Sequence, residues 1–208
     1  MVNEEFKKYV ESYIIPLYSN FDKAHDENHV RQVIENSLLM AKEYNLDENI
    51  IYAAAAYHDI GLSVERNRHE VYSKEIMFQD EIIQTYFTAD EQIIIGDAIL
   101  THRASNKTEP KTLYGKVIAD SDNDLQKDRI IERMLLYSID HYPEYSKSNH
   151  LVRCYNHAIE KYGETGYLKL WLDSNVNKNN LNEIRKIIAD KKLFEKEFSY
   201  YYDKHVNK

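Results

Sequence analysis

Apolar residues recur at intervals of three and four through most of the chain, which predicts amphipathic helices. The first pattern spans about residues 3–18, with Asn3 as its N-cap, and the second spans about 27–44. Thr88 to Glu91 has the form of a capping box, which opens a helix that ends near His102. This periodicity predicts an all-α protein in which helices pack against one another.

Further helical patterns fill the second half of the chain, at about 112–125, 127–141, 149–162 and 181–204. Residues Tyr167 to Leu172 alternate between polar and apolar only in part, which fits a short strand or a helix. The Asn-rich residues 175–182 are typical of a loop.

The stretch from Tyr52 to Gly61 organises this pattern. Four consecutive alanines, residues 53–56, let neighbouring helix backbones approach closely, so we expect this helix at the centre of a bundle. The helix ends in the pair His58-Asp59, and Gly61 supplies conformational freedom to stop it. Burying two ionisable groups costs several kcal/mol unless a partner such as a metal ion satisfies them.

Length and composition agree with one helical domain. The 208 residues suffice for a single domain over 1–208, and the low content of five Gly and three Pro predicts few turns and long helices. We therefore predict a single-domain helical bundle with a buried metal centre.

Charge and cysteine content exclude some classes of function and location. The net charge of −8 argues against nonspecific binding to nucleic acid. Cys154 is the single cysteine, which excludes an internal disulfide and fits a reducing compartment. No apolar run approaches the roughly 20 residues of a membrane span, and the N-terminus lacks the basic start of a signal peptide. We predict a cytoplasmic protein that does not associate with membranes.

Six ionisable residues lie at the ends or on the inner faces of predicted helices. Imidazole and carboxylate groups together suit transition metals such as Fe, Mn, Zn, Ni or Co better than calcium. A second His-Asp pair, His25-Asp26, falls in a polar loop and lacks the buried helix before it. The six candidate ligands are His29, His58, Asp59, His69, His102 and Asp120.

The order of these residues resembles the HD superfamily of metal-dependent phosphohydrolases, over roughly residues 20–130. The motif of that family is a His, then an adjacent His-Asp, then a distant Asp. Here these positions are His29, the pair in His58-Asp59-Ile60-Gly61, and Asp120. Residues 131–208 match no motif of the family, and their role is left open between a lid and the surface of a homodimer.

Some members of the superfamily hold two metals and carry two additional histidines, which His69 and His102 match. The resemblance then implies that Asp59 bridges two ions. His29, His58 and Asp120 would complete one site, and His69 and His102 would belong to the other. The implied cofactor is one or two divalent ions, with Fe or Mn favoured and Ni, Co, Zn or Mg as alternatives.

A phosphorylated substrate also needs cations, and we expect a subset of Arg66, Arg103, Lys107 and Lys116 to supply them. Guanosine tetraphosphate hydrolases of this superfamily carry an acidic pair immediately after the His-Asp. The present chain has Ile60-Gly61 there, which disfavours an alarmone substrate.

The resemblance implies an enzyme that hydrolyses a phosphate ester or anhydride in a nucleotide or another small phosphorylated metabolite. In that mechanism a metal-bound hydroxide attacks phosphorus, and Asp59 is the catalytic carboxylate that holds the metals. Two alternatives stay open. One is a di-iron oxygenase of the same superfamily, and the other is a non-catalytic module that binds metal or nucleotide.

Overall fold

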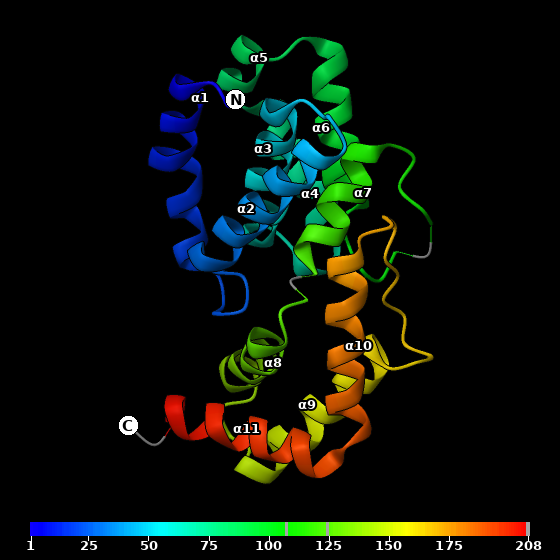
Figure 1. The fold of residues 1–208 in the computed structure, drawn as a ribbon. Coiled ribbons are helices and arrows are strands. Elements are labelled where there is room, and N and C mark those ends of the chain that lie inside the picture. The colour runs from blue at the N-terminus through cyan, green and yellow to red at the C-terminus, as the bar shows by residue number, and fades with distance from the viewer. Residues whose placement is uncertain (107, 124, 207–208) are drawn as a thin grey trace. The chain divides into compact units, whose positions relative to one another are not determined.

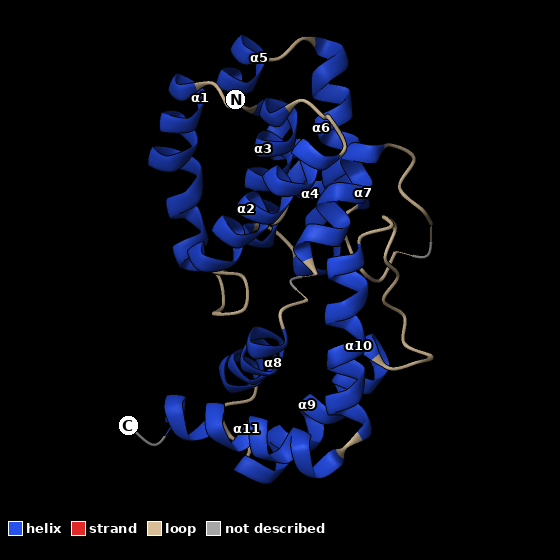
Figure 2. Ribbon diagram, in the orientation of Figure 1, coloured by secondary structure: helices blue, strands red, loops and turns tan. Residues whose placement is uncertain are grey.

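The computed structural model describes residues 1–106, 108–123 and 125–206, and these residues form helices and loops without any strand (Figure 2). The all-α prediction is therefore confirmed. Lys107, one of the four predicted phosphate contacts, lies outside the described residues. The helices are α1 Glu4–Tyr9, α2 Glu27–Glu43, α3 Glu48–Tyr57, α4 His69–Gln79, α5 Glu81–Tyr86, α6 Ala89–Thr101, α7 Leu113–Asp122, α8 Lys127–His141, α9 Lys147–Tyr162, α10 Asn175–Ala189 and α11 Lys191–Val206.

Contacts divide the chain into two compact units. Apart from the blue residues Asp22–Ala24 of the second unit, their colours in Figure 1 run from blue to green and from yellow-green to red. The first unit comprises Met1–Phe21 and His25–Asn123, and the second comprises Asp22–Ala24 and Asp124–Lys208. All six predicted metal ligands belong to the first unit. A single domain over 1–208 stays a prediction. None of the described helices has the length and apolar character needed to span a membrane.

The N-terminal helical segment begins where the sequence predicts, with the Asn3 side chain accepting hydrogen bonds from two backbone N–H groups. It does not continue as one α-helix to residue 18. A π-helical turn, η1, covers Val10–Ile14, and a 3-10 segment, η2, covers Ile15–Asn20. Pro16 explains this change, because proline has no N–H to donate to the preceding turn. The tighter segment contains Tyr18, which is completely buried.

Helix α2 carries the first predicted ligand in its first turn. The Asp26 side chain accepts from the backbone N–H groups of Asn28 and His29. Asp26, from the His25-Asp26 pair, is therefore the N-cap of α2. At the other end, Asn45 adopts a left-handed conformation with φ of 53°, and Leu46 N donates to Ala41 O at 2.9 Å. This is the arrangement by which an asparagine can end a helix.

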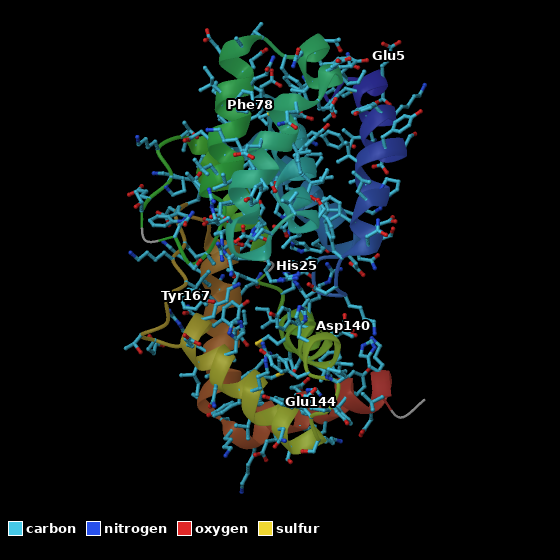
Figure 3. All side chains as sticks on the ribbon, turned by 180° about the vertical axis from the view of Figure 1, so that it is seen from behind. Glu5, His25, Phe78, Asp140, Glu144 and Tyr167 are labelled. Carbon is cyan, nitrogen blue, oxygen red and sulfur yellow. The ribbon has the colours of Figure 1, made fainter. Side chains whose placement is uncertain are left out.

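Helix α3 is the centre of the first unit. Residues 53–56, its four alanines, are all fully buried, and α2, α6 and α7 pack against the helix. Side chains occupy the space between these ribbons (Figure 3). The small alanine side chains permit this close packing on several sides, as predicted from the sequence.

The second unit contains α8, α9, α10 and α11, which bury an apolar core that includes Ile130, Leu135 and Phe194. Two predictions for this part were wrong. Residues 175–182 are helical rather than a loop, because the Ser174 side chain accepts from Asn177 N and caps α10. The helix predicted over 181–204 is divided, because the carboxylate of Asp190 accepts from the backbone N–H groups of two residues at the start of α11. Residues 167–172 form neither a strand nor a helix.

Asp80 links three helices of the first unit through its carboxylate. Tyr9 Oη on α1 donates to Asp80 Oδ2 at 2.7 Å, and Tyr57 Oη at the end of α3 donates to the same oxygen. The other oxygen, Oδ1, accepts from Ile82 N at 2.9 Å and caps α5. Burial and the bond to Asp80 raise the pKa of Tyr9 to about 12, so this hydroxyl remains a donor.

Asp80→Ala removes this cap and leaves two tyrosine hydroxyls without their acceptor. We expect the free energy of unfolding to fall by about 2–4 kcal/mol, the sum of a lost cap and two lost hydrogen bonds. Chemical denaturation followed by far-UV circular dichroism measures this change. Asp90→Ala, an exposed acidic residue in the first turn of α6, is the control and should cost less than about 1 kcal/mol. Equal losses in the two variants would contradict the role of Asp80.

Candidate metal centre

Five candidate ligands lie at the end of a helix or within its first turn. His58 is the C-cap of α3, His102 is the C-cap of α6, and His69 is the first residue of α4. His29 lies in the first turn of α2, and Asp122 is the last residue of α7. The chain brings these ends together around Asp59, which is buried with 3% of its surface exposed.

The first group consists of His29, His58, Asp59 and Asp122, whose candidate ligand atoms all lie within 4.8 Å of one another. His29 Nε2 is 3.2 Å from Asp122 Oδ1 and 3.3 Å from His58 Nε2. His58 Nε2 is 3.2 Å from Asp59 Oδ2. Two imidazoles and two carboxylates therefore converge on one point.

The second group consists of Asp59, His69 and His102. Asp59 Oδ1 lies 3.1 Å from His69 Nε2 and 3.4 Å from His102 Nε2, and the two Nε2 atoms are 3.1 Å apart. Asp59 thus turns one carboxylate oxygen to each group. A carboxylate shared in this way can bridge two cations.

The hydrogen bond made by Nδ1 determines the tautomer of three histidines. Nδ1 of His58, His69 and His102 lies 2.8, 2.9 and 2.6 Å from the backbone carbonyl oxygen three residues earlier. A carbonyl oxygen can only accept, so each Nδ1 is the donor, and Nε2 of the neutral ring carries a lone pair. Hydrogen bonds of this kind orient metal-binding histidines.

The inward-facing Nε2 lone pairs show that these residues fit a metal ion. In the second group, the Nε2 lone pairs of His69 and His102 face each other and a carboxylate oxygen across about 3 Å. Buried acceptors at this distance repel one another unless a cation or a proton lies between them. The donor set therefore fits a divalent metal ion. The buried His/Asp groups could hold such an ion without any change in their hydrogen bonds to the backbone.

Electrostatics favours the ionised carboxylates. Burial alone raises the pKa of Asp59. When protons rather than a metal ion lie between the acceptors, the positive charge of His58 and hydrogen bonds from the Nε2–H groups of neighbouring histidines lower this pKa well below its ordinary value. Burial likewise opposes ionisation of Asp122, and the hydrogen bond and charge of His29 reverse that effect and lower its pKa. Both carboxylates are therefore charged over the whole neutral range, as metal ligands must be.

The structure places Asp122, rather than the predicted Asp120, in the first group. Asp120 is buried on α7 and belongs to neither group of candidate ligands among the described residues. Two residues along an α-helix correspond to a rotation of about 200°, so the two carboxylates leave α7 in different directions. The family motif does not distinguish these two aspartates, and the assignment of Asp120 as a ligand stays a prediction. The position of Asp122 at a helix end, like His58 and His102, is the signal that favours it.

The predicted phosphate contacts lie in different surroundings. Arg103 follows His102 and donates from Nη1 to Asn67 O at 2.8 Å and to Glu70 Oε2 at 3.1 Å. Lys116 pairs with Glu109. Arg66 is half-buried, and its carbonyl oxygen accepts from His69. Three of the four predicted phosphate contacts lie in the described residues. Among these three, Arg103 connects the segments that carry the two histidines of the second group.

Gly61 is required for close packing and not for a left-handed conformation, since no glycine among the described residues has a positive φ. The 3-10 segment η3, Ile60–Ser63, passes directly over the start of α4. Gly61 N donates to Ser73 Oγ at 2.8 Å, and a Cβ atom at residue 61 would overlap the His69 carbonyl oxygen. The prediction that Gly61 serves the end of α3 therefore needs correction. Gly61 instead lets η3 lie close to α4, and so holds Asp59 Oδ1 within 3.1 Å of His69 Nε2.

Comparisons with known proteins identify a family and a fold. Residues 27–125 match the HD domain family. A crystal structure of a protein from Lactobacillus plantarum, a Northeast Structural Genomics target, shares the fold, with a TM-score of 0.66 and 20% identity over 96% of this chain and 100% of that chain. A comparison with curated proteins found no match.

Fold and site together define an all-helical protein with a buried histidine–aspartate centre able to hold metal. The family match carries the assignment further: residues 27–125 match the HD domain, and this match together with the shared fold supports assignment to the HD superfamily. This is a superfamily of metal-dependent hydrolases. The resemblance to this superfamily, predicted from the sequence, is confirmed.

Gly61→Ala forces backbone atoms apart, because the added Cβ would meet His69 O and, at 2.5 Å, Ser73 N. We expect a loss of about 1–3 kcal/mol in the free energy of unfolding, typical of overpacking. We also expect a metal affinity lower by roughly 10-fold or more, as for changes that displace ligand supports.

Gly96→Ala is the matched control for this change. There the Cβ would meet the ring edge of Phe78 and the flexible ends of Lys74 and Met77, which can move. Denaturation and titration with Mn²⁺ measure stability and affinity. Unchanged Mn²⁺ affinity in Gly61→Ala would show that the close approach of η3 and α4 does not position the ligands.

The paired variants Asp122→Asn and Asp120→Asn decide which carboxylate of α7 is a ligand. Because only Asp122 lies in the first group, we expect its amide variant to bind metal roughly 10- to 100-fold more weakly or to lose one ion per chain. The Asp120 variant should keep its metal. Elemental analysis of the purified proteins measures the metal content, and the reverse pattern would restore the ligand assignment from the sequence.

Proposed function

We propose that this protein is a metal-dependent phosphohydrolase that acts on a nucleotide or another small phosphorylated metabolite. The observation that carries the proposal is the shared carboxylate of Asp59, with one oxygen toward each of two histidine groups. A centre with two adjacent cation positions suits phosphoryl transfer, where both the attacking and the leaving oxygen need stabilisation.

The residues of the first group would hold one ion, and His69, His102 and the second oxygen of Asp59 would hold the other. When bound, such ions activate water and neutralise charge on a phosphoryl group. Four imidazoles with carboxylates suit Fe, Mn, Co, Ni or Zn better than Mg. We propose two ions of Fe or Mn.

The protein would contribute a dry and rigid site. The side chains of His58 and His102 are 0% and 1% exposed, whereas those of His69 and Asp122 are 11% and 19% exposed. A substrate therefore meets the centre at its His69 and Asp122 edges. Low solvent access strengthens the interaction of fixed charges with a phosphate.

Arg103 is the best supported phosphate contact among the described cations. Its side chain is 30% exposed, and its bonds to Asn67 O and Glu70 hold the guanidinium beside the segment that begins at His69. A guanidinium can give two parallel hydrogen bonds to a phosphate. Arg66 and Lys116 are further candidates, and Lys116 pairs with Glu109 as Arg103 pairs with Glu70.

We further propose that the protein acts in the cytoplasm, on the basis of its single buried Cys154 and the absence of a membrane-spanning helix among the described residues. Its acidic net charge of −8 favours small substrates over nucleic acid as partners. A homodimer surface in residues 131–208 stays a prediction from the sequence.

Asp59→Asn tests the function because it keeps the size of the side chain and removes the charge that both groups share. We expect this variant to lose metal from both groups and to lose at least about 1000-fold in phosphatase activity, since both ions depend on one carboxylate. The assay measures phosphate release from a panel of nucleotides and sugar phosphates with Mn²⁺ or Fe²⁺. Chelation with EDTA should abolish the same activity, and added metal should restore it.

Asp173→Asn, at an exposed loop position, is the matched control and should retain full activity. No phosphate release from any substrate by the metal-loaded wild-type protein would contradict the proposal. If that protein instead consumes O2, or binds nucleotide without turnover, the oxygenase or the binding module is the better assignment.

A further inference from the structure

The hydroxyl of Tyr18 lies against the end of α3, where the His-Asp pair begins. Tyr18 Oη is 2.9 Å from Ala56 O and 3.3 Å from Asp59 N, and the tyrosine is completely buried. Its ring lies 6.3 Å, centroid to centroid, from that of His58. Tyr18 comes from η2, which precedes the residues that match the HD domain family.

The direction of both hydrogen bonds is determined by their partners. A carbonyl oxygen accepts, so the tyrosine proton must point to Ala56 O, and the N–H of Asp59 must donate to the tyrosine oxygen. The last carbonyl groups of a helix and the amide that follows lack intrahelical partners. Tyr18 satisfies one of each at the point where the chain turns from α3 into η3.

A second bond at the same helix end makes the arrangement specific. Ala55 O, the acceptor that a continued α-helix would offer to Asp59 N, instead accepts from His58 Nδ1 at 2.8 Å. The histidine therefore has its tautomer set, and Asp59 N is free to bond Tyr18. Asp59 leaves helical geometry with φ of −110° and ψ of 1°.

We propose that Tyr18 is a positioning residue of the metal centre. Its hydroxyl holds the peptide of Asp59 so that the two carboxylate oxygens of that side chain face the two histidine groups. A rotation of this peptide would move both oxygens at once, so the loss of one hydroxyl weakens both cation positions. The inference rests on the metal centre of the proposed function and is independent of the reaction catalysed there.

Tyr18→Phe removes the oxygen and keeps the buried ring. We expect the variant to bind Co²⁺ roughly 10- to 100-fold more weakly in both positions, as for other residues that orient metal ligands. The visible absorption of bound Co²⁺ should also change, because the geometry of the ligands changes. Titration of metal-free protein, followed by absorption and by elemental analysis, measures affinity, stoichiometry and spectrum.

Tyr57→Phe is the matched control. It also removes one buried tyrosine hydroxyl at the end of α3, but this hydroxyl donates to Asp80 and makes no bond to Asp59. We expect a similar decrease in melting temperature for both variants, with the wild-type Co²⁺ affinity and spectrum retained only in Tyr57→Phe. Circular dichroism confirms that each variant is folded.

The outcomes separate the inference from the proposed function. Wild-type Co²⁺ binding in Tyr18→Phe, or an equal loss in both variants, overturns the positioning role. If the wild-type protein binds two Co²⁺ ions but hydrolyses no phosphate, the weaker binding of Tyr18→Phe still supports the inference while the proposed reaction fails. A wild-type protein that takes up no Co²⁺ overturns both.

Discussion

The main constraint on this structure is that buried hydrogen-bond acceptors around Asp59 repel one another. Three histidines donate from Nδ1 to the backbone, so their Nε2 lone pairs point inward, toward two ionised carboxylates. Such an arrangement is stable only with a cation or with protons between the acceptors. The fold therefore brings mutually repelling acceptors together. Apolar packing around them and the binding of a cation or of protons supply the free energy that offsets this repulsion.

Helix ends make this arrangement possible. A helix terminus provides unpaired backbone carbonyl groups, and His58 and His102 use those of the turn before them to orient their own rings. The same rings then need no other polar partner on that side. Close packing of α3, which its alanines allow, brings several helix ends within a few ångströms of Asp59. Backbone and side chain thus act as one unit, and rigid helices locate the ligands.

Much of this could be predicted from the sequence, because its signals are local. Caps such as Asn3 and Thr88, and the apolar periodicity, located most helices, and the order of His and Asp residues identified the family. The misses have physical causes. Pro16 changes the helix type, and the Ser174 cap starts α10 in an Asn-rich segment. The ligand assignment on α7 stays open, because spacing alone does not separate Asp120 from Asp122: the rotation between these two positions of the helix decides which carboxylate lies beside His29.

Tyr18 and Gly61 show what a ligand motif leaves out. Neither donates an atom to the candidate centre, yet one bonds the peptide of Asp59 and the other allows η3 to approach the start of α4. Asp59 is the one residue common to both groups. A displacement of its carboxylate therefore disturbs both groups, whereas a displacement of His29 or His102 disturbs one. Metal binding should therefore be most sensitive to changes in the contacts of Asp59. These contacts come from the N-terminal segment and from α4, which are distant in sequence, and only the folded structure reveals that they converge.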